Sequence, residues 1–231
     1  MSLRRFLKLS GSLWLQGIKR KDQLCQQSVR YLGLIISEGT RAIGPEKIKP
    51  IPNHPLPMTL RELRRFLGIT GYCYIWIPGY GELARPLYKL IAETQQAQTN
   101  KLVWSPDTQK AFKVLQTAIL QASALSLPTG SGFNLFVTER KGVALGILTQ
   151  ARGPHWQPIA HLSRKLDVIT RGWPHCLRVI GAAALLPPEA LKVINRRNLT
   201  VLNSHDVNGI LNSKVNIWMT DSRLLKISHC C

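Results

Sequence analysis

One segment, residues 59–91, restricts the fold of this chain more than any other. In its first part, apolar side chains return every three or four residues, which is the spacing of one face of an α-helix. That face consists of Leu60, Leu63, Phe66, Leu67 and Thr70. Thr59 and Glu62 have the spacing of a capping box, which satisfies free N–H groups at a helix start. The pattern predicts an amphipathic helix over residues 59–71.

The polar face of this helix is basic. Arg61, Arg64 and Arg65 lie off the apolar face, and Gly68 follows one turn later. Arginines beside a glycine would let a helix backbone come close to a phosphate-lined groove. An ordinary amphipathic helix with solvated arginines fits the same pattern, so the pattern alone leaves both interpretations open.

The rest of the segment predicts partners for that helix. Residues 72–77 are aromatic and apolar, and the Pro78-Gly79 pair indicates a turn. A second helix over residues 82–91 presents a leucine stripe. The expected product is a small helical bundle with a core of Phe66, Tyr74, Trp76 and Leu87. We interpret these aromatic residues as core rather than as a platform for stacked bases.

The charge of the chain points to a polyanionic partner. It holds 31 Lys+Arg against 12 Asp+Glu among 231 residues, a formal net charge of +19. Residues 1–130 carry 18 basic and 7 acidic side chains, and residues 131–231 carry 13 and 5. Phosphate contacts release counterions, which makes nucleic acid the natural partner. The alternatives are a basic protein without such a partner and one attracted to anionic membranes.

Composition gives little support to membrane insertion, export or metal binding. No apolar run approaches the length of a membrane span, and no convincing signal segment is present. Five scattered cysteines without a CxxC pair fit free thiols in a reducing compartment. We therefore expect no structural metal, no membrane partner, and a cytoplasmic or undetermined location. Residues 1–20 are uninformative.

Further elements are expected on both sides of the bundle. A β-hairpin over residues 23–37 has Gly33 between its strands, and a proline-rich strap over residues 43–58 leads to the bundle. Residues 93–100 are expected to form a polar linker. Ser105 caps a further helix that begins at Pro106.

The period of the apolar residues changes after residue 133. Three strands are expected, then a helical region interrupted by two prolines, then a fourth strand and a short helix. The expected ranges are 133–137, 143–148, 157–162, 176–186, 189–194, 199–202 and 207–211. This order is that of an RNase H-like fold.

A resemblance to a known family is carried by the stretch LRELRRFLGITGYCYIWIPGYGELARPLYKLI. It closely resembles the thumb of gammaretroviral reverse transcriptases, a part of Pol. QLCQQSVRYLGLIISEGTR resembles the end of the palm, and LVWSPDTQKAFKVLQTAILQASALSLP with residues 133–225 resembles the connection. The resemblance covers residues 21–226. Over this range the sequence is similar to Pol of class I endogenous retroviruses. It implies an α+β fold with a palm remnant (1–44), a helical thumb (45–100) and an RNase H-like connection (101–231).

The resemblance also implies roles for individual residues. Leu32, Gly33 and Leu34 match the tip of the primer grip, which holds a primer end. Arg61, Arg64, Arg65 and Gly68 match the thumb helix, which follows the minor groove of the template–primer. In the connection, the implied contacts are Arg140, Lys141, Arg164 and Lys165. The implied partners are an RNA–DNA or other nucleic-acid duplex and an intact retroviral polymerase.

The resemblance does not extend to a catalytic site. The family holds Mg²⁺ on paired aspartates, and this sequence contains no such pair. At the carboxylate positions of an active RNase H fold stand Thr138, Leu177 or Arg178, and Ser204. Glu139 and Asp206 are offset by one or two positions, so we expect their side chains to point away from that site.

We therefore expect no catalytic residue, no metal and no cofactor. The sequence predicts a truncated Pol fragment that retains duplex binding, without fingers, most of the palm or the RNase H domain. The alternatives are a non-functional, partly unfolded product of a provirus, and a non-catalytic nucleic-acid-binding or decoy protein.

Overall fold

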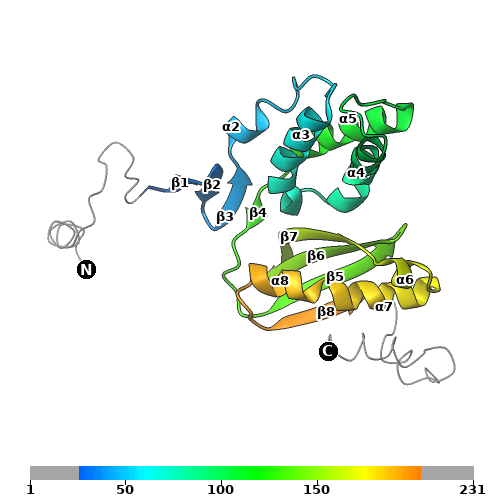
Figure 1. Cartoon of the computed structure of the whole chain (residues 1–231). Coiled ribbons are helices and arrows are strands. Elements are labelled where there is room, and N and C mark those ends of the chain that lie inside the picture. The colour runs from blue at the N-terminus through cyan, green and yellow to red at the C-terminus, as the bar shows by residue number, and fades with distance from the viewer. Residues whose placement is uncertain (1–25, 204–231) are drawn as a thin grey trace, which may run out of the picture.

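Two hydrophobic cores organise the computed structural model, which describes residues 26–203 (Figure 1). The first core joins a small sheet to a group of helices, and the second lies between a larger sheet and two helices. This α+β architecture confirms the predicted fold class. None of the helices in the described range has both the length and the apolar character that crossing a bilayer requires.

The predicted hairpin is confirmed, but it belongs to a larger sheet than the sequence indicated. Three antiparallel strands follow in order, and a fourth strand joins the third. They are β1 (Ser28–Tyr31), β2 (Leu34–Ser37), β3 (Thr40–Ile43) and β4 (Leu125–Ser126). The sequence analysis missed β3, whose four residues are too few to show a period. Both turns use positive φ angles, 50° at Leu32 and 79° at Gly33 in the first, and 47° at Glu38 and 76° at Gly39 in the second.

The amphipathic helix predicted at residues 59–71 is present with its predicted cap and buried face. Helix α3 (Leu60–Tyr72) begins after Thr59, whose Oγ1 accepts a hydrogen bond from the Glu62 N–H at 3.3 Å. The Glu62 carboxylate accepts from the backbone N–H groups of Met58 and Thr59, and these bonds lower the pKa of Glu62. Its buried residues are Leu60, Leu63, Phe66, Leu67 and Thr70.

The remaining helical elements close around α3. They are α2 (Pro45–Ile48), the 3₁₀ helix η1 (Tyr74–Trp76), α4 (Tyr80–Gln96) and α5 (Pro106–Leu120). Helix α5 begins at the predicted Ser105 cap, with Pro106 at its first position. Residues 93–96, expected in a linker, instead continue α4, because Thr94 is buried and donates its hydroxyl to the Leu90 carbonyl.

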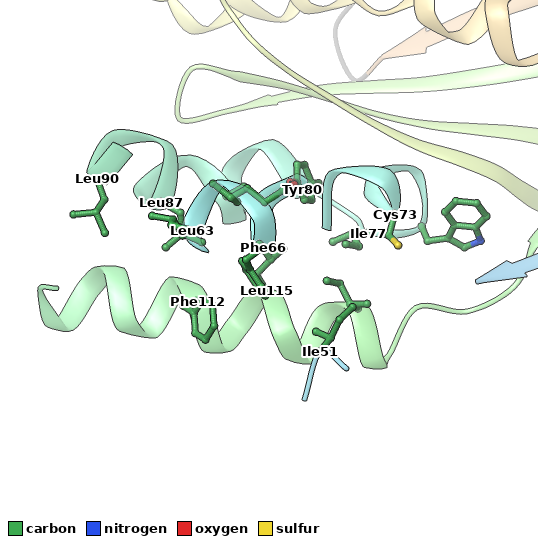
Figure 2. Packing of buried hydrophobic residues seen from close by; sticks show 14 of the residues in the cluster. Ile51, Leu63, Phe66, Cys73, Ile77, Tyr80, Leu87, Leu90, Phe112 and Leu115 are labelled. Atoms are coloured by element: carbon green, nitrogen blue, oxygen red, sulfur yellow. The ribbon is translucent and has the colours of Figure 1, made fainter. Parts of the chain in front are cut away.

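Helix α5 completes the first core. The rings of Phe66 and Phe112 lie 4.5 Å apart between their centroids, and Leu63, Leu87 and Leu115 are fully buried around them (Figure 2). The division expected at residue 100 assigned α5 to the sheet domain, whereas its apolar face packs in the helical core. Phe66 and Trp76 are core, as predicted, and Tyr74 is half-buried against that core.

The second sheet has the predicted RNase H-like order. Strands β5 (Phe133–Arg140), β6 (Val143–Arg152) and β7 (His155–Lys165) are antiparallel, and β8 (Leu199–Asn203) runs parallel to β5. The spatial order is β7-β6-β5-β8. The short helix α6 (Val168–Arg171) precedes α7 (His175–Leu185) and α8 (Pro187–Val193). The helix expected at residues 207–211 lies outside the described residues.

Helices α7 and α8 lie across one face of this sheet (Figure 1). Leu135 and Val137 of β5 point to that face, and they pack with residues such as Ala182 and Leu186. Gly146 permits the close approach, since a Cβ atom there would lie 2.9 Å from Leu186 Cδ1. The alternate residues of β5 point to the opposite face and are exposed or half-buried.

A single arginine joins the small sheet to both other parts. Arg41 of β3 donates from Nη2 to the Ile159 carbonyl of β7 at 2.9 Å. The Arg41 carbonyl accepts from Trp76 Nε1 of η1 at 3.2 Å, and the guanidinium lies 5.7 Å from the centre of the Trp76 ring. The first sheet, the helices and the second sheet therefore meet at one residue.

Candidate nucleic-acid interface

The outward face of α3 carries the predicted basic residues. Arg61, Arg64 and Arg65 are exposed, while the neighbouring Leu63 and Phe66 are buried. None of these arginines has a hydrogen bond or ion pair among the described residues, so their charges face solvent. The helix thus combines a packed side with a row of unneutralised positive charge.

Gly68 lies on the same exposed face. A Cβ atom placed there would meet no atom within 4 Å. Packing within the chain therefore does not require a glycine, although glycine costs roughly 0.5–1 kcal/mol relative to alanine inside a helix. The open space leaves the α3 backbone accessible at this point.

The predicted primer-grip residues lie at the first turn of the small sheet. Leu32 is 73% exposed, whereas Gly33 and Leu34 are half-buried. The Leu32 carbonyl accepts a hydrogen bond from Tyr72 Oη at 2.6 Å. Burial raises the pKa of Tyr72, which keeps this hydroxyl protonated and able to donate.

The hairpin tip is therefore held at the C-terminal end of α3, where Tyr72 is the last residue. Gly44 N–H also donates to the Gly33 carbonyl at 2.9 Å, and Lys47 Nζ lies 5.4 Å from the centre of the Tyr72 ring. These contacts bring the two predicted groups, residues 32–34 and the basic face of α3, onto neighbouring elements.

The four connection residues differ in how much free charge they present. Arg164 forms an ion pair with Glu189 of α8, and Lys141 Nζ lies 3.9 Å from Glu82 Oε1. Arg140 and Lys165 are exposed at the ends of β5 and β7, where Val143 of β6 lies between them in the sheet. Arg140 and Lys165 are consequently the better placed pair for an external anion.

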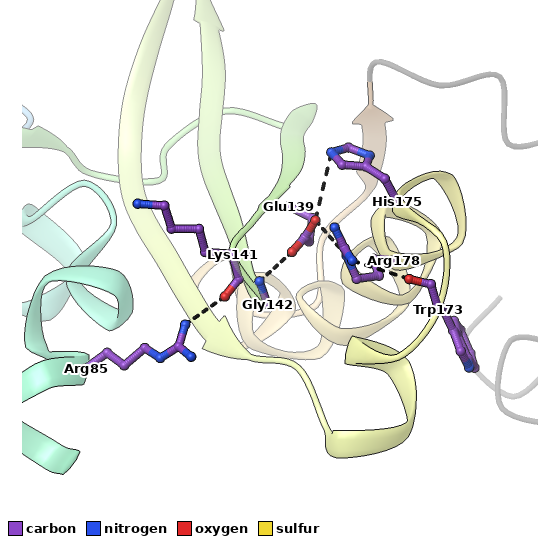
Figure 3. Close-up of polar contacts among 7 residues, drawn as sticks. All are labelled: Arg85, Glu139, Lys141, Gly142, Trp173, His175 and Arg178. Carbon is purple, nitrogen blue, oxygen red and sulfur yellow. Dashed lines mark hydrogen bonds and ion pairs between the residues drawn. The ribbon is translucent and has the colours of Figure 1, made fainter.

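The turn between β5 and β6 also contacts the helical unit. Arg85 of α4 donates from Nη1 to the Lys141 carbonyl at 2.8 Å (Figure 3). Gly81 N–H donates to Ser163 Oγ of β7 at 2.8 Å, and a Cβ atom on Gly81 would lie only 3.1 Å from that oxygen. A close polar contact thus holds the start of α4 against the second sheet.

Glu139 lies where β5 meets α7, and its carboxylate is 1% exposed. It accepts from Gly142 N–H at 2.6 Å and from Arg178 Nε at 3.1 Å, and His175 Nε2 lies 3.9 Å away (Figure 3). The prediction that the Glu139 side chain points away from the carboxylate site of an RNase H fold is wrong, because this side chain points to α7. Thr138 is the exposed residue on the opposite face of β5.

The carboxylate between β5 and α7 is therefore neutralised by a guanidinium. Among residues 26–203, no three His, Cys, Asp or Glu side chains gather as a metal ion would require. Leu177, at the other helix position that the resemblance indicated, is buried. Ser204 and Asp206 lie outside the described residues.

Comparison with known proteins agrees with this architecture. The chain is 41% identical over 222 residues to the Gag-Pol polyprotein of Baboon endogenous virus (strain M7), covering 96% of this chain and 13% of that protein. The Gag-Pol polyprotein of Avian reticuloendotheliosis virus is 43% identical over 206 residues, covering 89% of this chain and 18% of that protein. The chain is homologous to one segment of retroviral Pol polyproteins. No family model matches the chain.

Solved structures show the same fold for this Pol-related chain. The foamy viral protease-reverse transcriptase in complex with double-stranded DNA superposes with a TM-score of 0.77 at 17% identity, over 88% of this chain and 36% of that one. The foamy viral enzyme in complex with an RNA/DNA hybrid gives a TM-score of 0.76 at 18% identity, over 91% and 28%. The chain thus shares the fold of part of a reverse transcriptase, and it spans far less than the whole length of its relatives.

Sequence reasoning missed three contributors to this surface. Tyr72 and Lys47 position the hairpin tip, and Ser163 holds α4. No local pattern indicates these contacts, because they join residues far apart in the chain. The adjacent positive-φ residues Leu32 and Gly33 only mark a tight turn.

A first prediction concerns the buried ion pair between Glu139 and Arg178. Replacing Arg178 with Met leaves a buried carboxylate without its guanidinium, which should reduce the free energy of unfolding by roughly 3 kcal/mol. Adding Glu139→Gln should recover part of that loss, because the uncompensated charge is then removed. The measurement is urea unfolding of both variants.

Lys89→Met is the matched control. Lys89 and Glu93 form an ion pair at 3.4 Å that is exposed on both sides, so its loss should cost less than about 0.5 kcal/mol. Equal effects of Arg178→Met and Lys89→Met would contradict a buried, charge-dependent contact at Glu139.

Proposed function

We propose that this chain binds a nucleic-acid duplex through the outward face of α3 and the neighbouring hairpin tip, without catalysing a reaction. The observation that carries the proposal is the composition of that face. Three exposed arginines without acidic partners precede Gly68 on the same face, and the helix backbone is open to solvent at Gly68. Such a surface fits a phosphate-lined groove, which attracts positive charge and permits close backbone approach.

Several further features support this proposal. The foamy viral relatives in fold were solved in complex with double-stranded DNA and with an RNA/DNA hybrid. In this chain, Tyr72 attaches residues 32–34 to the end of α3, so a duplex along the helix would reach the tip. Arg140 and Lys165 would add contacts further along. An intact retroviral polymerase, the other expected partner, stays a prediction.

The arginine face is tested by replacing Arg61 and Arg65 with Gln. We expect weaker duplex binding and a log–log salt slope reduced by about one for each lost phosphate contact. Melting should shift little, because exposed substitutions usually change stability by less than about 0.5 kcal/mol. Fluorescence anisotropy over a salt series measures binding, and circular dichroism measures melting.

Lys110→Gln with Lys113→Gln is the control pair, since both lysines are exposed on α5 and the change in net charge is the same. Equal losses of duplex affinity in the two double variants would show that only net charge matters. The parent chain should melt cooperatively, and the absence of a transition would instead favour the partly unfolded provirus product.

Gly68→Ala separates binding from folding. A methyl group at residue 68 meets no atom of the chain, so unfolding should become about 0.5–1 kcal/mol more difficult. If a groove approaches the backbone there, the same methyl group should weaken duplex binding about fivefold, the equivalent of about 1 kcal/mol of overpacking. A variant that is more stable and binds equally well would remove Gly68 from the interface.

Catalysis should be absent. The sequence has no adjacent aspartate pair, and Glu139 is engaged by Arg178. Nucleotide transfer and hybrid cleavage both depend on metal ions held by clustered carboxylates. Primer extension and RNA cleavage in a hybrid should therefore stay at background with Mg²⁺ or Mn²⁺. Extension that persists through further purification and follows the chain on a sizing column would refute this part of the proposal.

A further inference from the structure

The face of the second sheet opposite α7 and α8 carries an exposed aromatic pair. Phe136 of β5 is 40% exposed and Trp156 of β7 is 53% exposed. Their ring centroids lie 6.5 Å apart with the planes at 79°, an edge-to-face contact that orients both rings. Ile147, beside Phe136 on β6, and Leu202, beside it on β8, are also exposed. We call these four residues the aromatic face.

The strand register places these residues on one side of the sheet. Leu135 and Val137 are buried toward the helices, so Phe136 between them points away from the helices. Ile147 and Leu202 are the direct partners of Phe136 in the neighbouring strands and share its side. The aromatic face is therefore a different surface from the outward face of α3.

The charge beside the aromatic face is positive. Arg152 and His155 are exposed at the β6–β7 turn, but they are one residue from the Ala151–Trp156 pair, so they point to the other side of the sheet. Arg140 is exposed on the same side of β5 as Phe136, four residues or about 13 Å further along. Within strands β5 to β8 the one acidic residue is Glu139, which points to the opposite face and is neutralised. A polyanion would meet no carboxylate on these strands.

His161 adds no positive charge to the aromatic face. It is the partner of Ile147 on β7. Burial lowers the pKa of His161, so the ring is neutral near pH 7. The positive charge on this side of the sheet therefore comes from Arg140.

We propose that the aromatic face binds single-stranded nucleic acid, with unpaired bases stacking on Phe136 and Trp156 and the backbone running toward Arg140. An exposed aromatic ring can stack only on bases whose faces are free, and the faces of bases inside a duplex are not free. The charge favours a nucleic acid over a protein partner, although aromatic residues and arginine are also enriched in protein interfaces. This site shares Arg140 with the proposed duplex surface, but its aromatic residues are separate from α3 and the hairpin tip.

The test compares a short oligothymidylate with a duplex hairpin by fluorescence anisotropy at one salt concentration, using the full chain. Trp156→Ala should weaken oligothymidylate binding roughly 5- to 150-fold, the range of one lost base stack. Phe136→Ala should act in the same direction. Trp156→Phe should retain most of the affinity, because a phenyl ring still stacks. Duplex binding should be unchanged in all three variants.

Tyr88→Ala is the matched control, because Tyr88 is an aromatic residue of α4 that is 50% exposed. Melting of each variant checks that the fold persists. Unchanged oligothymidylate binding in both Trp156→Ala and Phe136→Ala would overturn the proposal. If those variants instead shift the oligomeric state by light scattering while strand binding persists, the aromatic face is a protein contact. The Arg61 and Arg65 variants test duplex binding separately, so the two proposals can fail independently.

Discussion

Arg41 contacts all three parts of this chain and is the residue at which they meet. Its guanidinium reaches from β3 to a backbone carbonyl of β7 and lies beside Trp76, whose indole N–H returns to the Arg41 carbonyl. Burial lowers the pKa of Arg41, yet an arginine side chain does not lose its proton in proteins. Its Nε is buried without a hydrogen-bond partner among residues 26–203. An unpaired buried N–H is destabilising, so the Nη2 bond to Ile159 and the bond from Trp76 to the Arg41 carbonyl must offset this cost.

The proposed duplex surface combines the same three parts. Residues 32–34 belong to the same sheet as Arg41, and the Tyr72 hydroxyl ties their turn to α3. On the other side, the Gly81 N–H and the Arg85 guanidinium hold α4 against β7 and the β5–β6 turn. Each of these contacts is a hydrogen bond with a defined direction. The surface is therefore built from three separate segments whose positions are fixed by polar contacts between packed cores.

The sequence predicted those features that local chemistry determines. Helix α3 follows from its apolar period and from the Thr59 cap, and both are read within thirteen residues. Local sequence could not predict to which core α5 belongs or in which direction the Glu139 side chain points. Helix α5 has an apolar face that would fit either unit, and only the long-range contact of Phe112 with Phe66 decides between them. Glu139 is offset by one residue from the expected position, and strand register, which is a tertiary property, decided its face.

Net charge, like local sequence, does not show how the residues are arranged in the fold, so it gives only limited information about function. A formal charge of +19 predicts attraction to polyanions in general, but it does not say where they bind. Lys141 pairs with Glu82, Arg164 with Glu189, and Arg178 with Glu139. These ion pairs within the chain neutralise part of the positive charge. The exposed charge that remains includes the arginines of α3, which precede the open helix position at Gly68, and Arg140, on the side of the second sheet that carries exposed rings. The outward face of α3 suits the groove of a duplex, and the aromatic face suits unpaired bases. Steric access, rather than charge, distinguishes the two ligands.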